Sequence, residues 1–283
     1  MPPRAAPTAR QQRLGAELRK MREHAGLNVG EAGQELGADR TRISNIEAGR
    51  VGVSAERVRA LAAIYSCDDA AYVDALAAMA VERGTGWWAE YRGVLSTSAL
   101  DIAELEHHAR SLTVVQVVFI PGLLQTEEYA RALFSRAVPE LSATEIARRV
   151  SYRMRRKCVM ERKEPTDCTF IIHECALRML HADQEGQKRQ LQRLLDVSEQ
   201  DGVTLRVIPF SAGGFPGAHS SMTYATGPVR KLDTVSLDTP HGSMMLDAET
   251  HLENYRRITQ RIMKVASDPR ASQDFIRAIA KQL

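Results

Sequence analysis

The stretch "GADRTRISNIEAGR", residues 37–50, contains a short helix with its own start and stop signals. Asp39 is a good N-cap, because its carboxylate can accept hydrogen bonds from the free backbone N–H groups of a first helical turn. Gly49 suits the position just past a helix end, where a positive φ is common. The pattern predicts a helix over 40–48. A helix of fewer than roughly 12 residues is unstable alone in water, so this one must be held by packing.

The two sides of this predicted helix differ in chemistry. Ile43 and Ile46 fall on one side and can face an earlier helix. The other side is small and polar, whereas a merely solvated face more often carries Glu and Lys four residues apart. Small residues let a helix enter a DNA major groove, and Asn and Arg offer the paired hydrogen bonds that base edges require. The residues of this outer face and its edges are Arg40, Thr41, Arg42, Ser44, Asn45 and Ala48.

Glu47 lies beside the apolar side of the same helix. An ionised carboxylate in that place needs a partner. Arg22, at the end of the preceding predicted helix, is the candidate. We expect a structural ion pair between Arg22 and Glu47, outside any binding site.

Helical patterns surround this stretch. Leu14, Leu18 and Met21 recur at helical spacing and predict a first helix over 10–25. Asn28 can cap a second helix, which closes at Gly37. Two further helices follow, in "SAERVRALAAIYS" and "DDAAYVDALAAMAVERG". The sequence predicts an all-α unit of five helices over 10–80, preceded by a disordered arm over 1–9.

Charge is unevenly distributed along the chain. The net charge is +3, and residues 1–66 hold 11 Lys or Arg against 7 Asp or Glu, an excess of +4. A basic N-terminal unit suits an acidic partner such as nucleic acid. On charge alone, a chance excess on a charge-rich surface is the favoured alternative.

Compartment and membrane signals are weak. No apolar run approaches the roughly 18 residues of a membrane span. The basic N-terminus lacks the apolar core of a secretory signal. The four cysteines contain no CxxC pair, which favours free thiols in a reducing cytosol over a disulfide frame or a zinc site. We expect a cytoplasmic protein with no membrane partner.

Residues 10–75 resemble the XRE, or Cro/cI-type, helix-turn-helix domain of phage repressors. The resemblance rests on "LRKMREHAGLNVGEAGQELGADRTRISNIEAGR" and on the pairing of Arg22 with Glu47. It implies double-stranded DNA as the partner and a homodimer as the acting form. By position, it implies that base edges are read by Arg40, Thr41, Ser44 and Asn45. It implies phosphate contacts for Asn28 and Arg50, and Arg42 is added to these from its place at the helix edge.

A second domain is expected over 97–283, after a junction over 81–96. The β-branched run "LTVVQVVFI" (112–120) predicts a buried strand, and further strands are predicted over 168–174, 203–210, 222–226, 234–238 and 243–246. Helices are predicted between them and over 248–267 and 270–282. Because several strands follow one another near the end, the sequence predicts an α+β domain with a mixed or antiparallel sheet.

A basic helix is predicted over 142–163, with Arg149, Arg153 and Arg156 in one stripe. Such a stripe could clamp phosphates or an acidic partner. A solvated face with local salt bridges is the favoured alternative.

Catalytic patterns are missing from the sequence. No HExxH, GxSxG or phosphate-binding loop occurs, and the histidines show no metal-ligand spacing. We expect no catalytic residue, no metal and no cofactor. The residues expected to contact a ligand or partner are the junction aromatics Trp87, Trp88 and Tyr91 and the carboxylate Glu174. Packing between domains is the favoured alternative for the aromatics, and a satisfied structural carboxylate for Glu174.

The second domain resembles the large domain attached to XRE-type regulators in actinobacteria, described as antitoxin-like. The resemblance rests on "IPGLLQTEEYARAL" (120–133), "IIHECALRML" (171–180), "QLQRLLDVSEQDGVTLRVIPF" (190–210) and "AGGFPGAHSSMTYA" (212–225). It implies a transcriptional regulator that often pairs with a small partner protein. We expect a sequence-specific DNA-binding regulator whose second domain dimerises and senses a signal. An antitoxin-like interaction protein and a ligand-gated sensor remain as alternatives.

Overall fold

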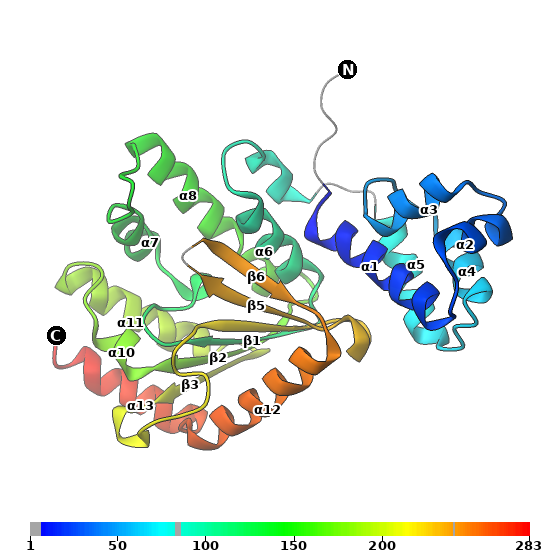
Figure 1. The fold of residues 1–283 in the computed structure, drawn as a ribbon. Helices are drawn as coiled ribbons and strands as arrows, with labels where there is room; N and C mark the ends of the chain where they lie inside the picture. The colour runs from blue at the N-terminus through cyan, green and yellow to red at the C-terminus, as the bar shows by residue number, and fades with distance from the viewer. Residues whose placement is uncertain (1–6, 83–85, 240) are drawn as a thin grey trace. The chain divides into compact units, whose positions relative to one another are not determined.

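The structure is a computed structural model that describes residues 7–82, 86–239 and 241–283. The chain divides into two compact units, Met1–Glu90 and Tyr91–Leu283, drawn in Figure 1. Most of the expected disordered arm over 1–9, and residues 83–85 of the expected junction, lie outside the described residues. In the described part of the chain, no helix combines the length and apolar character needed to cross a membrane.

The described part of the first unit contains five α-helices, each begun by a side-chain cap. The caps are Thr8, Asn28, Asp39, Ser54 and Asp69, whose side-chain oxygens accept from backbone N–H groups of the first turns. These are the residue types that favour helix starts, so local chemistry sets the boundaries. The helices are α1 (Ala9–His24), α2 (Val29–Leu36), α3 (Arg40–Glu47), α4 (Ala55–Ile64) and α5 (Ala70–Val81).

Glycines allow the backbones of this unit to approach closely. A Cβ on Gly15 of α1 would lie 2.4 Å from the carbonyl oxygen of Glu47, at the end of α3. A Cβ on Gly33 of α2 would lie 2.8 Å from the carbonyl oxygen of Ala38, in the turn before α3. Both distances are shorter than a side chain tolerates, so α3 is held against α1 and α2 at backbone distance.

The second unit is built on a six-stranded mixed sheet, ordered β3-β2-β1-β4-β5-β6 in the described residues. The first three strands in that order run parallel to one another, and β4, β5 and β6 pair antiparallel. The prediction of an α+β domain is confirmed, and the sheet is mixed. The strands are β1 (Ser111–Gln116), β2 (Asp167–His173), β3 (Val203–Ile208), β4 (Met222–Thr226), β5 (Thr234–Thr239) and β6 (Gly242–Leu246).

Helices cover both faces of this sheet (Figure 1). One apolar cluster joins Val114 and Phe170 on the first face to α11, α13 and the segment after β1. A second cluster joins Val115 and Ile171 on the opposite face to α12. Neighbouring residues of one strand thus enter different cores, as strand geometry requires. The helices are α6 (Thr97–His108), α7 (Glu127–Phe134), α8 (Ala143–Arg155), α9 (Cys158–Glu161), α10 (Glu174–Arg178), α11 (Gln184–Ser198), α12 (Glu249–Val265) and α13 (Pro269–Ala280).

Some predicted element ends are wrong. The strand expected over 112–120 ends at Gln116, and the chain bends away from the sheet. The helix expected over 142–163 is broken into α8 and α9, because the backbone tightens into a turn at Arg156 and Lys157. The strand expected over 168–174 stops at His173, whose side chain caps α10.

Candidate DNA-contacting helix and a polar cavity

Helix α3 is held at both ends and along one side. Its N-cap Asp39 accepts a hydrogen bond from the Arg42 backbone N–H at 2.6 Å. At the other end Gly49 takes a φ of +68°, which ends the helix. Ile43 and Ile46 are 1% and 2% exposed, so the apolar side is fully buried. The opposite side of α3 is therefore fixed in orientation toward solvent.

The residues predicted to read bases lie on that outer side. Arg40, Thr41 and Ser44 are exposed, and Asn45 is half-buried. All four belong to the same eight-residue helix, so the structure brings them together on one element. The side chains there are short apart from Arg40, which leaves α3 able to approach a groove closely.

The residues predicted to hold phosphates border α3. Arg42 lies within the helix and Arg50 follows its end, and both are exposed. In the described part of the chain, the guanidinium groups of Arg40, Arg42 and Arg50 make no hydrogen bond or ion pair. The Asn28 Oδ1 atom caps α2, accepting from Gly30 N at 2.8 Å. Its side-chain amide nitrogen makes no hydrogen bond within the described residues.

Arg22 and Glu47 join α1 to the end of α3. The Arg22 Nε atom donates to Glu47 Oε1 at 2.6 Å, and NH2 donates to Oε2 at 2.9 Å. Arg22 also donates from NH1 to the Leu27 carbonyl oxygen at 2.7 Å, which ties down the connection before α2. Each of the two side chains is 7% exposed. The hydrogen bonds to Glu47 raise the pKa of Arg22, although burial opposes that shift. The pair holds α3 in place and presents nothing to a ligand.

The residues expected to contact a ligand in the C-terminal part are dispersed. Trp87 and Trp88 belong to the first unit and stack edge to face at 6.0 Å, with Trp88 buried. Tyr91 belongs to the second unit and packs edge to face against Tyr152 at 5.3 Å. Glu174 is 7% exposed and accepts from Phe210 N at 2.7 Å and from Arg178. None of these four described residues lines the cavity of the second unit.

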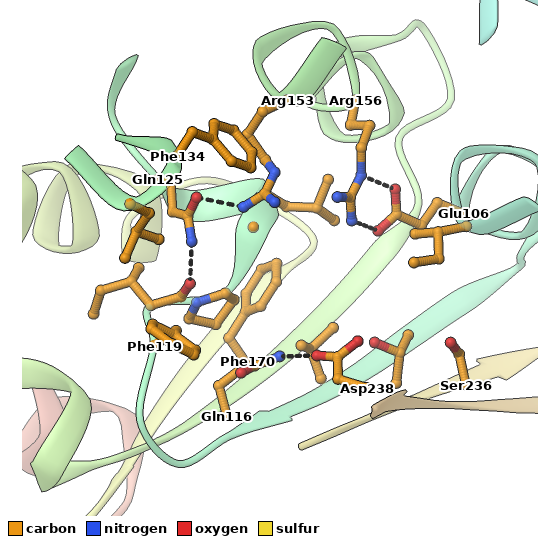
Figure 2. A pocket seen from close by; sticks show the side chains of 18 of the residues that line it. Glu106, Gln116, Phe119, Gln125, Phe134, Arg153, Arg156, Phe170, Ser236 and Asp238 are labelled. Carbon is orange, nitrogen blue, oxygen red and sulfur yellow. Dashed lines mark hydrogen bonds and ion pairs between the residues drawn. The ribbon is translucent and has the colours of Figure 1, made fainter. Parts of the chain in front are cut away.

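That cavity has a volume of about 560 Å³ and lies within the second unit (Figure 2). The strand register explains its floor. Val114 pairs with Phe170 on β2 and with Thr223 on β4, and Thr223 pairs with Ser236 on β5. Paired residues of neighbouring strands point to the same face, so these four side chains form one row. Gln116 and Asp238, two residues further along β1 and β5, extend the floor, and Gln116 Nε2 donates to Asp238 Oδ2 at 3.1 Å.

Two arginines and a glutamine close the cavity from the other side. Figure 2 shows Arg153 and Arg156 extending from the end of α8 toward the floor. Arg156 forms a bidentate ion pair with Glu106 of α6, with Nε to Oε2 at 2.8 Å. Arg153 donates instead to Gln125 Oε1, and Gln125 Nε2 donates to the Ile120 carbonyl oxygen at 2.7 Å. A Cβ on Gly122 would lie 3.3 Å from NH1 of both arginines, so a glycine there gives them room.

The two arginines differ in electrostatic state. Burial and the neighbouring charge of Arg156 lower the pKa of Arg153 to about 10. Burial acts on Arg156 as well, but Glu106 outweighs it and raises the pKa of Arg156. In the described part of the chain, no carboxylate lies within ion-pair distance of Arg153, and its Nε atom has no hydrogen-bond partner. Arg153 is half-buried, and its direct contacts within the described residues are the Gln125 amide oxygen and the Phe134 ring, 5.2 Å away, while the charges of Glu106 and Asp238 act on it from a greater distance.

The sequence contained part of the signal for this cavity. The sequence predicts the stripe of Arg149, Arg153 and Arg156 and favours a solvated face for it. That interpretation is wrong for Arg153 and Arg156, because the end of α8 faces the sheet across the cavity and both side chains line it. Glu106 and Asp238 lie far from the stripe in sequence, and only the strand register and the position of α6 bring them to it.

A protein-family model matches within each of the two units. The model of a helix-turn-helix domain matches residues 13–76, which contain α2, α3 and most of α1. No curated protein and no solved structure matches the chain. The model of a domain of unknown function (DUF5753) matches residues 99–278, more than half of the chain and nearly all of the second unit. The chain therefore belongs to the family of proteins that carry this domain of unknown function, DUF5753, here behind a helix-turn-helix domain.

Proposed function

We propose that the protein is a sequence-specific DNA-binding transcriptional regulator that inserts α3 into the major groove. The observation that carries this proposal is the outer side of α3, which is small, polar and exposed. Its three neighbouring guanidinium groups have no partner within the described residues. In a helix-turn-helix domain the second helix of the motif occupies the groove, and here that helix is α3.

The proposed contacts divide into two kinds. Arg40, Thr41, Ser44 and Asn45 read base edges, because their side chains lie on the outer side of the helix that enters the groove. Asn28, Arg42 and Arg50 hold phosphates on either side of it. Phosphate contacts fix the position of the protein on DNA and carry no sequence information directly.

The proposal also covers the oligomeric state, the cellular location and the role of the second unit. The XRE resemblance supports a cytoplasmic homodimer whose two copies of α3 enter successive major grooves about 34 Å apart on a palindromic site. The second unit would dimerise the protein and sense a signal. The proposed activity is binding, without catalysis. Of the two alternatives, the ligand-gated sensor is favoured over the antitoxin-like interaction protein by the cavity in the second unit.

The test is a selection from random double-stranded DNA with the full-length protein at moderate salt, read by sequencing. The expected result is an enriched motif with two-fold symmetry. In parallel, the Asn45→Ala variant should lose about 1–3 kcal/mol on the best site and accept more bases at one position of each half-site. Ser54→Ala serves as a control, because it removes only the cap of α4.

The outcomes separate the parts of the proposal. An enriched motif without two-fold symmetry would support sequence-specific DNA binding but contradict the proposal of a homodimer. A protein that enriches no sequence, yet is folded, would overturn DNA reading. An unchanged base preference in Asn45→Ala would remove Asn45 from the base-reading set.

A further inference from the structure

The cavity of the second unit holds one guanidinium group, that of Arg153, that makes no ion pair within the described residues. Arg156 is matched by Glu106 through two hydrogen bonds, whereas the direct contacts of Arg153 in that part of the chain are the Gln125 amide and the Phe134 ring. Placing a charge out of water is costly unless it is paired. A protein that keeps such a cation in a cavity, with Nε unsatisfied, leaves the pairing to something that enters the cavity.

We propose that this cavity is a binding site for a small amphipathic monocarboxylic acid, whose carboxylate pairs with the Arg153 guanidinium. The inference stands apart from DNA binding, since it concerns the second unit alone and is tested without DNA. A guanidinium is planar and offers two parallel N–H donors, which match the two oxygens of a carboxylate.

The charge balance of the lining selects a monoanion. Three arginines and two carboxylates line the cavity, which leaves a formal excess of one positive charge. Arg136 and Asp238 are both exposed, and Glu106 is paired with Arg156, so among the described residues the charge left without an ion pair inside the cavity is that of Arg153. A single carboxylate restores neutrality there. A dianionic phosphate would bring one negative charge more than Arg153 can match, and it would also be repelled by Asp238 on the floor.

The remaining lining selects an apolar body with a small polar end. Phe119, Phe134 and Phe170 line the cavity, and Figure 2 shows Phe134 beside the Arg153 side chain and Phe119 and Phe170 below it. Ser236 and Asp238 lie at the other end of the floor, where a hydroxyl or amine group could be bound. Phe119 is 44% exposed and Asp238 is exposed, so the cavity is open to solvent and a ligand can enter. Its volume of about 560 Å³ is within the range of small-molecule sites, roughly 300–1,000 Å³.

The experiment is isothermal titration of the full-length protein with defined acids and their neutral matches. The acids are octanoate, decanoate, 4-phenylbutyrate and indole-3-acetate, and each is compared with its primary amide. We expect saturable binding of at least one acid with a dissociation constant below about 1 mM, and its amide should bind about ten- to a hundredfold more weakly.

Variants locate the charge that is responsible. Arg153→Met keeps an apolar side chain of similar reach, and Arg153→Gln keeps polarity without charge. Both should weaken binding of the acid about ten- to a hundredfold and leave the affinity for the amide unchanged. Arg148→Met is the matched control, because Arg148 lies on the same helix, is exposed and does not line the cavity. Circular dichroism establishes that each variant is folded, and the glutamine variant carries the test if the methionine variant is not.

Three results would overturn the proposal. The first is that none of the acids binds below about 1 mM. The second is that acid and amide bind equally, which would describe an apolar pocket without an anion site. The third is that Arg148→Met weakens binding of the acid as much as the Arg153 variants do, which would mean that the acid binds on the outer surface of α8.

Discussion

Arg22 and Glu47 bind each other through two hydrogen bonds of 2.6 and 2.9 Å, across a gap of 25 positions in the chain. Helix α3 is only eight residues long and cannot persist alone. The pair fastens its last residue to α1, and the same guanidinium holds the backbone at Leu27. The orientation of the helix proposed to read DNA thus depends on an ion pair that never touches DNA.

Glu47→Gln should destabilise the first unit by about 3–5 kcal/mol, because it leaves the Arg22 charge buried without its partner. Urea denaturation followed by tryptophan fluorescence measures this, since both tryptophans of the chain belong to the first unit. Asp74→Asn is the control. The Asp74 side chain is 68% exposed and pairs with Arg59 on the surface of the same unit, so its loss should cost less than about 1 kcal/mol. Equal losses would contradict the structural role of the pair.

Gly15→Ala should also destabilise the first unit, against the usual preference of helices. Alanine in a helix is ordinarily favoured over glycine by about 1 kcal/mol. A Cβ at this position would lie 2.4 Å from the Glu47 carbonyl oxygen and 2.6 Å from that of Ile46, and backbone atoms cannot move aside cheaply. We expect a net loss of about 1–3 kcal/mol. Gly52→Ala, with open space around it, should change the free energy of unfolding little. A stabilised Gly15→Ala variant would refute the close packing of α1 on α3.

Arg50→Ala should weaken binding to all DNA sequences alike. Arg50 follows the end of α3 and is exposed, and it is proposed to hold a phosphate, which every DNA sequence offers. Removing one phosphate contact should reduce the slope of log affinity against log salt by about 1. Fluorescence anisotropy over a salt series measures both quantities on the selected site and on random DNA. A changed base preference with an unchanged slope would move Arg50 to the base-reading set.

Much of the first unit could be predicted from the sequence, because its signals are local. Caps such as Asp39 and glycines such as Gly49 act within a few residues, and the apolar spacing of Ile43 and Ile46 reports the buried side directly. The Arg22–Glu47 contact could also be predicted, because a carboxylate beside the buried apolar side of a helix needs a cationic partner, and few cationic side chains could reach Glu47.

The second unit was harder to predict, because its features depend on register and on distant segments. The run over 112–120 is apolar throughout, and nothing in it marks the bend after Gln116 that brings Phe119 to the cavity. The parallel pairing of β1 with β2 joins residues more than 50 positions apart. Arg153 reaches the cavity because the end of α8 faces the sheet there, and helical periodicity alone does not fix that placement.

Glu174 should make the second unit sensitive to acid. Burial raises its pKa, but the Phe210 N–H and Arg178 outweigh this and hold the pKa below the ordinary value of 4.5. A carboxylate whose pKa is lowered by folding adds stability above its unfolded pKa, and that stability is lost as pH falls through the folded value. Glu174→Gln should therefore be less stable than wild type near pH 7, and the difference should shrink below about pH 4. Calorimetry over a pH series measures this, with the exposed Glu127→Gln as control.

Arg153→Met and Arg156→Met should change stability in opposite directions when no ligand is bound. Arg153 is a half-buried cation with no carboxylate within ion-pair distance in the described part of the chain, so its removal at pH 7 relieves a penalty, and we expect a gain on the order of 1 kcal/mol. Removing Arg156 leaves Glu106, whose side chain is 4% exposed, buried without its partner, which should cost about 3–5 kcal/mol. Thermal unfolding of the two variants in parallel provides the measurement. If Arg153→Met instead lowers the free energy of unfolding by several kcal/mol, the fold itself neutralises Arg153. Arg153 would then stabilise the free protein and would not serve to bind a ligand.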